Sequence, residues 1–303
     1  MSPAIPFRSE DELDALVAAF EALTLPKVQW THAMHVTIGG CFYLRHGEAG
    51  ALARLRPGIR RLNESHGVVN SDTHGYHESL TRLWIALIAR FLDEYRALHP
   101  RTARAAAIQA LAESFGHRSR IFKEYWTSDV TSSREARALW QPPDALPPDI
   151  AVLDCDSPLG WESARSLLTC YAADLPPHAA AGVQADAAHA HSPYPDARTA
   201  LLLARAREGS IGCIALRELE SSVGEIKRLY VTPEHRRRGT ARLLMNAALA
   251  RARRLGLERV RLGTLAEMAP AQALYRRLGF APVAAYPGSD PVDELWFELR
   301  LIA

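Results

Sequence analysis

The segment from Glu225 to Ala241 reads EIKRLYVTPEHRRRGTA, and it decides how the second half of the chain folds. It joins an alternating strand, a Thr-Pro turn, an arginine cluster and a Gly-x-Ala step that begins at Gly239 and leads into an amphipathic helix. A helix that starts after a tight turn presents unpaired backbone N–H groups and the positive end of its dipole, and both favour a bound phosphate. Small residues let the phosphate approach the backbone, while arginines add charged donors. The segment therefore predicts a cradle for a pyrophosphate.

Two motifs in this half are similar to those of the GCN5-related N-acetyltransferases, the GNAT family. The family signature Gln/Arg-x-x-Gly-x-Gly/Ala is matched by Arg236 to Ala241, and its A-x-x-L-Y-x-x-x-G-F element is matched by the run that contains Tyr275 and ends at Phe280. The departures are Arg237, where the family often has glycine, and alanine in place of the last glycine. The resemblance implies an α+β domain with a mixed, mostly antiparallel sheet flanked by helices.

The same resemblance implies acetyl-CoA as co-substrate. The pantetheine arm would pair with the backbone of the strand before the cradle, where the N–H of Leu229 would also meet the oxyanion, and the pyrophosphate would lie on the cradle itself. The residues implied in cofactor binding are Leu229, Tyr230, Val231, Arg236, Arg237, Arg238, Gly239, Thr240, Ala241 and Arg242.

Two residues are candidates for acid–base catalysis of acetyl transfer to an amine. Glu225 lies fourteen residues before Gly239, the spacing of the catalytic glutamate in one branch of the family, and would act as general base. Tyr275 stands where many relatives place the tyrosine that protonates the leaving thiolate. Each has a structural alternative, since Glu225 could pair with Lys227 or Arg228 and Tyr275 could be a core aromatic.

The composition is that of a soluble protein, with 23% charged and 48% apolar residues in a chain of 303. The sequence has no apolar run long enough for a membrane span and no secretory signal, so we expect a cytoplasmic protein. A net charge of +2 gives no general attraction to nucleic acid. The four cysteines are scattered, which indicates reduced residues and no zinc knuckle.

The chain is long enough for two domains. Four prolines within 141–148 mark the boundary, which predicts an all-α domain over 1–145 and the GNAT-type domain over 149–303. The apolar pattern predicts helices at 9–23, 31–46, 48–65, 76–98, 102–115, 119–125, 132–140, 161–174, 241–255 and 269–278, and strands at 150–153, 200–207, 210–219, 223–231, 259–264 and 295–301. Residues 175–198 show the least regular pattern and border the acceptor pocket by resemblance, or form a surface loop.

Histidines are concentrated in the helical half, which resembles an uncharacterised bacterial domain. His32 and His35 share one helix face, and His77 follows a Gly-Tyr pair in another segment. If these helices pack together, the three side chains are candidates for a divalent metal site. Helix caps and hydrogen-bonded core groups are the alternative roles.

The combined prediction is an N-acetyltransferase that acts on an unidentified small-molecule amine by direct attack. Homodimer formation is a further possibility, and neither nucleic acid nor a membrane is expected as a partner. A non-catalytic acyl-CoA-binding regulator and a helical metal-binding enzyme fused to an accessory GNAT domain are the alternative functions.

Overall fold

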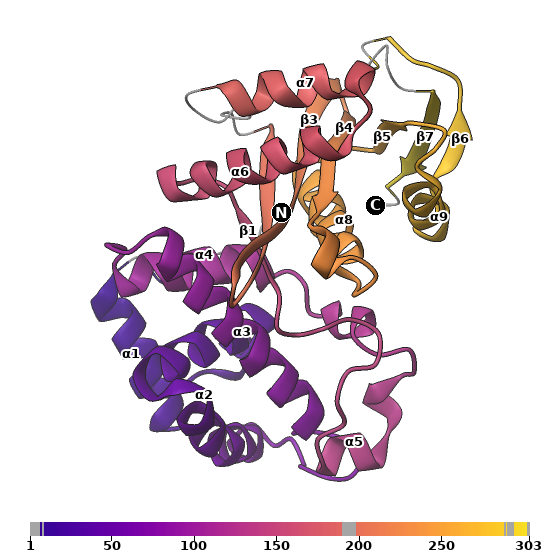
Figure 1. Ribbon diagram of the computed structural model, residues 1–303. Helices are drawn as coiled ribbons and strands as arrows, with labels where there is room; N and C mark the ends of the chain where they lie inside the picture. Colours follow the sequence, from indigo (N-terminus) through magenta and orange to yellow (C-terminus); the bar gives the residue numbers. More distant parts are fainter. Residues whose placement is uncertain (1–6, 8, 190–197, 288, 290–293, 302–303) are drawn as a thin grey trace. The chain divides into compact units, whose positions relative to one another are not determined.

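The computed structural model describes residues 7, 9–189, 198–287, 289 and 294–301. The chain divides into two compact units, Met1–Ala151 and Val152–Ala303 (Figure 1). The first unit is helical and the second is built around a sheet. No helix in these described ranges is long and apolar enough to cross a lipid bilayer.

Capped helices build the N-terminal unit. The Oγ of Ser9 caps α1, the Oγ1 of Thr31 caps α2 and the Nδ1 of His77 caps α3, so each accepts a backbone N–H that has no partner inside its helix. The prediction of an all-helical N-terminal half is confirmed. Its described elements are α1 (Glu10–Glu21), α2 (His32–Ser65), α3 (Glu78–Leu98), α4 (Arg104–Phe115), α5 (Arg134–Ala138) and 3₁₀ turns at Lys27–Gln29, Ile121–Glu124 and Val130–Ser132.

Two glycines shape α2. A Cβ on Gly40 would lie 2.6 Å from side-chain carbons of Ile108 and Leu111, so glycine allows α2 to pack closely against α4. Gly47 has a φ of 68° and interrupts the helical backbone. The two helices predicted at 31–46 and 48–65 are therefore the two arms of one kinked element.

A seven-stranded sheet forms the core of the C-terminal unit, in the order β1-β2-β3-β4-β5-β7-β6. Only β4 and β5 pair in parallel among the pairs resolved by residue, which gives the mixed, mostly antiparallel sheet that the resemblance implies. Helices α6 and α7 lie on one face of β4, and α8 lies on the other. The elements are β1 (Ala151–Asp154), α6 (Pro158–Asp174), α7 (Pro177–Ala188), β2 (Ala200–Ala206), β3 (Gly209–Glu220), β4 (Val223–Val231), a 3₁₀ turn at Pro233–His235, α8 (Thr240–Arg254), β5 (Arg259–Thr264), α9 (Ala269–Arg277), β6 (Ala281–Val283) and β7 (Leu295–Arg300).

Two elements differ from the sequence expectation. Helix α7 occupies much of the segment that showed no regular pattern; it packs on α6, and its residues Ala180 and Val183 are buried. Strand β6 was not predicted because its three residues are exposed and include Pro282, so they carry no alternating pattern.

Candidate active site

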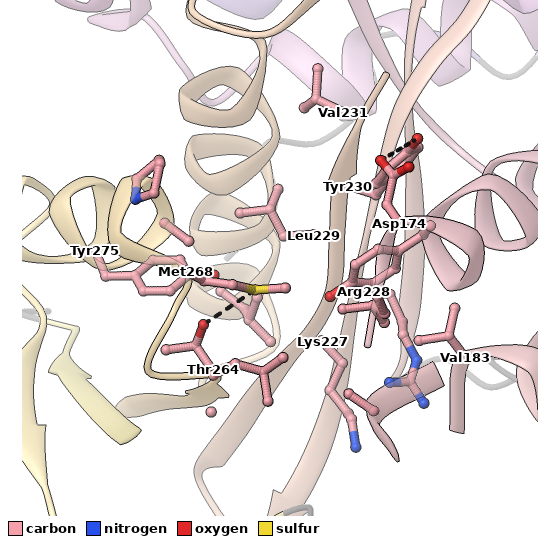
Figure 2. A pocket seen from close by; sticks show the side chains of 18 of the residues that line it. Asp174, Val183, Lys227, Arg228, Leu229, Tyr230, Val231, Thr264, Met268 and Tyr275 are labelled. Carbon is pink, nitrogen blue, oxygen red and sulfur yellow. Dashed lines mark hydrogen bonds between the residues drawn. The ribbon is translucent and has the colours of Figure 1, made fainter. Parts of the chain in front are cut away.

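A cleft opens in the sheet where β4 and β5 separate. The two strands pair only from Val223 to Glu225 on β4, opposite Arg259 to Arg261 on β5. Beyond this point both strands continue, to Val231 and Thr264 respectively, and a cavity of about 340 Å³ lies between their ends. Figure 2 shows its two walls, with Tyr275 and Met268 on one side and Tyr230 and Asp174 on the other.

A bulge in β4 accompanies this separation. Cys213 pairs with Tyr230 and Ala215 with Lys227, so Ile214 alone faces two residues of β4. One of them, Arg228, has a φ of 57°, which costs a residue with a side chain about 1–2 kcal/mol. Its guanidinium donates hydrogen bonds to Asp186 Oδ2 at 2.7 Å and to the carbonyl of Gly182 at 3.0 Å. Both acceptors belong to α7, so this helix holds the bulge.

The predicted cradle has the backbone geometry of a helix entry. Gly239 caps α8 with a φ of 85°, and Arg237 also lies in the left-handed region at 62°. Thr240 is buried, and its hydroxyl donates to the carbonyl of His235 at 3.3 Å. The first N–H groups of α8 consequently follow a tight turn whose rim carries the exposed Arg237 and Arg238.

The structure places the predicted cofactor residues in two groups. Leu229, Tyr230, Val231 and Arg236 line the cleft, whereas residues 237–242 lie at the start of α8, outside its lining. Arg236 bends toward the cleft wall, where its Nε donates to the carbonyl of Val231 at 2.9 Å and its Nη2 to Asp174 Oδ2 at 2.6 Å. An anion at this arginine would therefore share its guanidinium with Asp174.

The wall beneath Arg236 is aromatic. Tyr230 stacks on Tyr171 with ring centroids 5.3 Å apart, and the guanidinium of Arg236 lies 5.6 Å above the ring of Tyr230. The hydroxyl of Tyr230 donates to Asp174 Oδ2 at 3.3 Å. Burial, together with the neighbouring carboxylate, raises the pKa of Tyr230 to about 12, so this phenol stays protonated at neutral pH.

Glu225 lies at the closed end of the cleft and is 1% exposed. Its Oε2 accepts a hydrogen bond from Arg217 Nε at 2.6 Å, and its Oε1 accepts one from the hydroxyl of Tyr286 at 3.1 Å. The ion pair thus involves neither Lys227 nor Arg228, the partners considered from the sequence. Arg217 is instead the residue directly opposite Glu225 on β3.

Tyr286 and Arg217 were not identified as functional residues from the sequence. Arg217 could have been found by aligning the sequences of β3 and β4 as the two strands of a hairpin, although two register shifts interrupt their pairing. Tyr286 lies in the loop between β6 and β7, which carries no sequence motif, so no signal pointed to it. Its ring lies 5.1 Å from the guanidinium of Arg261.

Tyr275 projects from α9 into the cleft, on the wall opposite Tyr230 (Figure 2). Its ring also contacts Phe280 and Phe297, with centroid separations of 6.1 and 6.0 Å. The Tyr275 side chain therefore both packs in the core and lines the cavity, and its role as the acid stays a prediction.

The three candidate metal ligands of the N-terminal unit do not form a metal site. Among the described residues there is no group of three or more histidine, cysteine, aspartate or glutamate side chains that could hold an ion. The Nε2 of His32 lies 3.2 Å from the carbonyl of Phe115, and the Nε2 of His77 lies 3.1 Å from that of Val130. Because a nitrogen that donates to a carbonyl has no lone pair for a metal, these rings act as hydrogen-bonding groups.

A family model matches part of the C-terminal unit. Residues 161–280 match the model of the acetyltransferase (GNAT) family. The uncharacterized N-acetyltransferase YsnE of Bacillus subtilis is 39% identical over 85 residues, which are 26% of this chain and 56% of that protein. An IAA acetyltransferase of Azospirillum brasilense is 37% identical over 103 residues, 33% of this chain and 65% of that protein.

The chain thus spans between half and two thirds of the length of these curated relatives. A solved acetyltransferase of the GNAT family from Staphylococcus aureus is 17% identical, with a TM-score of 0.44, and the match covers 50% of this chain and 99% of that one. The family model covers both the cradle and the element that carries Tyr275. Residues 161–280 therefore form a domain of the GNAT acetyltransferase family.

Proposed function

We propose that the C-terminal unit transfers the acetyl group of acetyl-CoA to the amine of a small molecule. The observation that supports this most directly is the cleft between β4 and β5, which runs from the buried Glu225 to Arg236, three residues before the cradle at Gly239. Family membership of residues 161–280 gives the chemistry its general class.

In this proposal the cofactor lies along β4 and ends on α8. The edge of β4 from Leu229 to Val231 that would face β5 has left its pairing with that strand, while the other edge still pairs with β3. In this proposal the free edge receives an extended arm in the manner of an added strand, and Arg236 would have to release the carbonyl of Val231 wherever the arm needs it. The N–H groups at the start of α8, with the arginines beside Gly239 and with Thr240, Ala241 and Arg242, receive the pyrophosphate.

Acetyl-CoA supplies the acetyl group as a thioester. Glu225 accepts the proton that the attacking amine loses, directly or through a water molecule. The N–H of Leu229 donates a hydrogen bond to the oxygen that becomes negative as the new C–N bond forms. The hydroxyl of Tyr275 donates its proton to the sulfur as the C–S bond breaks, which leaves an amide and a free thiol.

The engagement of Glu225 favours one alternative, a regulator that binds acyl-CoA without turnover. Both carboxylate oxygens already accept hydrogen bonds, from Arg217 and Tyr286. A base must have a lone pair directed at its substrate, but each oxygen retains a second one. The geometry of Glu225 is thus compatible with both the transferase and the regulator. Both would bind the cofactor, and only the transferase would turn it over.

Calorimetry with CoA and a thiol-release assay with acetyl-CoA separate these functions. The assay should include amines, amino acids, aminoglycoside antibiotics and peptides as acceptors. Binding with turnover supports the transferase, binding without turnover on any acceptor supports the regulator, and no heat with millimolar CoA contradicts both. In the transferase, Glu225→Gln should lower kcat about 10²- to 10⁴-fold and remove a limb of the pH–rate profile. An unchanged rate and profile would remove Glu225 as the base.

The remaining predictions about the whole chain have direct tests. Limited proteolysis should cut between the proposed domains, 1–145 and 149–303, within the proline-rich segment. Light scattering on the purified protein should show a mass of about twice 33.4 kDa if it forms the homodimer. A fluorescent fusion expressed at native level tests the proposed cytoplasmic location.

A further inference from the structure

The N-terminal unit contains a cavity that the acetyl-transfer proposal does not use. It has a volume of about 450 Å³, larger than the cleft of the C-terminal unit. Protein interiors pack at high density and leave few voids larger than a water molecule, while small-molecule sites occupy roughly 300–1,000 Å³. This volume belongs to the second class. The cavity is formed by both arms of α2, the segment that joins α2 to α3, the first half of α3 and residues in or beside the turns at Lys27–Gln29 and Ile121–Glu124.

The walls of the cavity are apolar and aromatic. Trp30 and Trp84 contribute indole rings, and Phe122 adds a third aromatic group. Side chains such as Val36 and Ile88 fill the space between them. Flat rings of this kind give a planar ligand large contact areas at little cost in side-chain entropy.

The lining also has polar side chains, namely Asn63, Tyr76, Thr81, Ser119 and three histidines. Two of the histidines have hydrogen-bond partners in the protein. His77 uses Nδ1 to accept the N–H of Leu80 at 3.3 Å and approaches the carbonyl of Val130 with Nε2. His32 approaches the carbonyl of Phe115, and its ring lies 4.6 Å from that of Trp84. These contacts hold both rings in place in the wall.

His35 differs from the other two. Within the described part of the chain its ring makes no hydrogen bond, and it contacts the ring of Trp30 at a centroid distance of 4.0 Å. Its side chain has an exposed surface, yet protein surrounds the ring closely enough to lower its pKa to about 3. The accessible surface and the lowered pKa agree if the ring of His35 faces the cavity. Its accessible surface is then part of the cavity wall, and protein surrounds that wall.

The lining carries no charge. None of its twenty residues is aspartate, glutamate, lysine or arginine. Burial lowers the pKa of His32, His35 and His77, so all three rings are neutral at pH 7. A charged ligand would lose its hydration without gaining a counter-charge, which is strongly unfavourable.

A buried carboxylate, that of Glu78, follows the lining residue His77 in the chain, and its charge is compensated outside the cavity. Glu78 accepts hydrogen bonds from Arg56 Nε at 3.0 and 3.1 Å and from the hydroxyl of Tyr76 at 2.8 Å. Tyr76 belongs to the cavity wall, and its hydroxyl is directed at this carboxylate. The ion pair therefore fixes the wall without placing an unpaired charge against a ligand.

We propose that this cavity binds a small uncharged molecule with a flat, largely apolar body and one polar group, which forms a hydrogen bond with His35. The site is separate from the proposed acetyl transfer and does not depend on it. The ring of His35 offers one donor and one acceptor, so a hydroxyl, carbonyl or ring N–H of the ligand satisfies it.

Saturation-transfer NMR on the full chain tests the proposal with indole and benzamide as neutral probes and with benzoate and benzylamine as charged probes of similar size. The neutral probes should bind at millimolar concentration and the charged probes at least tenfold more weakly. His35→Leu should weaken binding of the neutral probes about 5- to 10-fold, the effect of one lost hydrogen bond. His46→Leu, the same change in α2 but outside the cavity lining, should leave binding unchanged.

A second variant keeps the test independent of folding effects at His35. Ser119 lies at an exposed position of the lining, so Ser119→Trp should fill the entrance without disturbing the core and should abolish binding. Circular dichroism confirms that each variant is folded. The proposal is wrong if the neutral probes do not bind, if Ser119→Trp binds them as the parent protein does, or if the charged probes bind equally well.

Discussion

Removal of Arg217 should destabilise the strands that form the cleft. Glu225 is 1% exposed, and Arg217 is the cation that pairs with it, at 2.6 Å. The substitution Arg217→Met leaves a buried carboxylate that retains the hydrogen bond from Tyr286 and loses its counter-charge. Breaking a buried pair in this way costs about 3–5 kcal/mol. Because the Arg217 side chain is 38% exposed, solvent screens part of this effect, and we expect a loss of about 2 kcal/mol.

Hydrogen–deuterium exchange measured by mass spectrometry gives the local readout that a two-domain chain requires. Peptides from β3 and β4 should exchange about 30-fold faster in Arg217→Met, since 1.4 kcal/mol corresponds to about a factor of ten. Peptides from α3 in the other unit serve as an internal reference. The double variant Arg217→Met/Glu225→Gln should recover much of the protection, because it leaves no buried charge without a partner.

Arg259→Met is the matched control. The Arg259 side chain is also 38% exposed, but it lies 3.7 Å from Glu298, which retains Arg261 at 2.8 Å. Its loss should cost less than about 0.5 kcal/mol. If Arg217→Met accelerates exchange in β3 and β4 no more than Arg259→Met does, the electrostatic argument for the Glu225 pair is wrong.

Three further predictions concern other parts of the chain. Gly40→Ala should lower the free energy of unfolding by about 1–3 kcal/mol in urea titrations, because the added Cβ would lie 2.6 Å from Ile108. Tyr275→Phe should lower kcat in the thiol-release assay while calorimetry shows unchanged affinity for CoA, and an unchanged kcat would remove its role as acid. Burial depresses the pKa of His35 to about 3. Below about pH 6.5 the unfolded chain therefore binds a proton that the folded chain does not, and the free energy of unfolding decreases as the pH is lowered. Allowing for solvent in the cavity, we expect the free energy of unfolding to decrease by about 1 kcal/mol from pH 7 to pH 5. Thermal unfolding measured across this pH range should show that His35→Leu removes most of the decrease.

The features that sequence predicted well are those set by neighbours along the chain. The helix predicted at 9–23 is present as α1, and the structure shows Ser9 as its N-terminal cap. The turn at Gly239 was predicted from small residues beside an arginine cluster, and its backbone is left-handed there. In each case one local run of residues determines the geometry.

Features that depend on pairing across the sheet were not predictable in the same way. The partner of Glu225 is set by the register of β3 against β4, and that register shifts twice within one hairpin. Candidates adjacent in sequence, Lys227 and Arg228, were therefore the wrong ones. Arg228 instead takes the bulge position and points to Asp186, which lies in a segment whose pattern gave no clear helix.

The histidines show the limit of spacing arguments. His32 and His35 lie three residues apart on one helix, as the sequence requires, but their rings have different neighbours. Both rings line the cavity, but His32 is held by the carbonyl of Phe115, whereas His35 lies beside Trp30. A shared helix face brings side chains to the same wall, and only the packing of the other helices determines whether that wall surrounds a metal, a hydrogen bond or an open volume.

The bulge in β4 connects the two least predictable features of the C-terminal unit. A left-handed conformation at Arg228 is unfavourable by itself, so the fold must supply compensating contacts. The hydrogen bonds to Asp186 and Gly182 provide them, and both come from α7. Ala179 and Val183 of the same helix line the cleft. The irregular composition before β2 therefore encodes a helix that both holds the distorted strand and forms one side of the cleft.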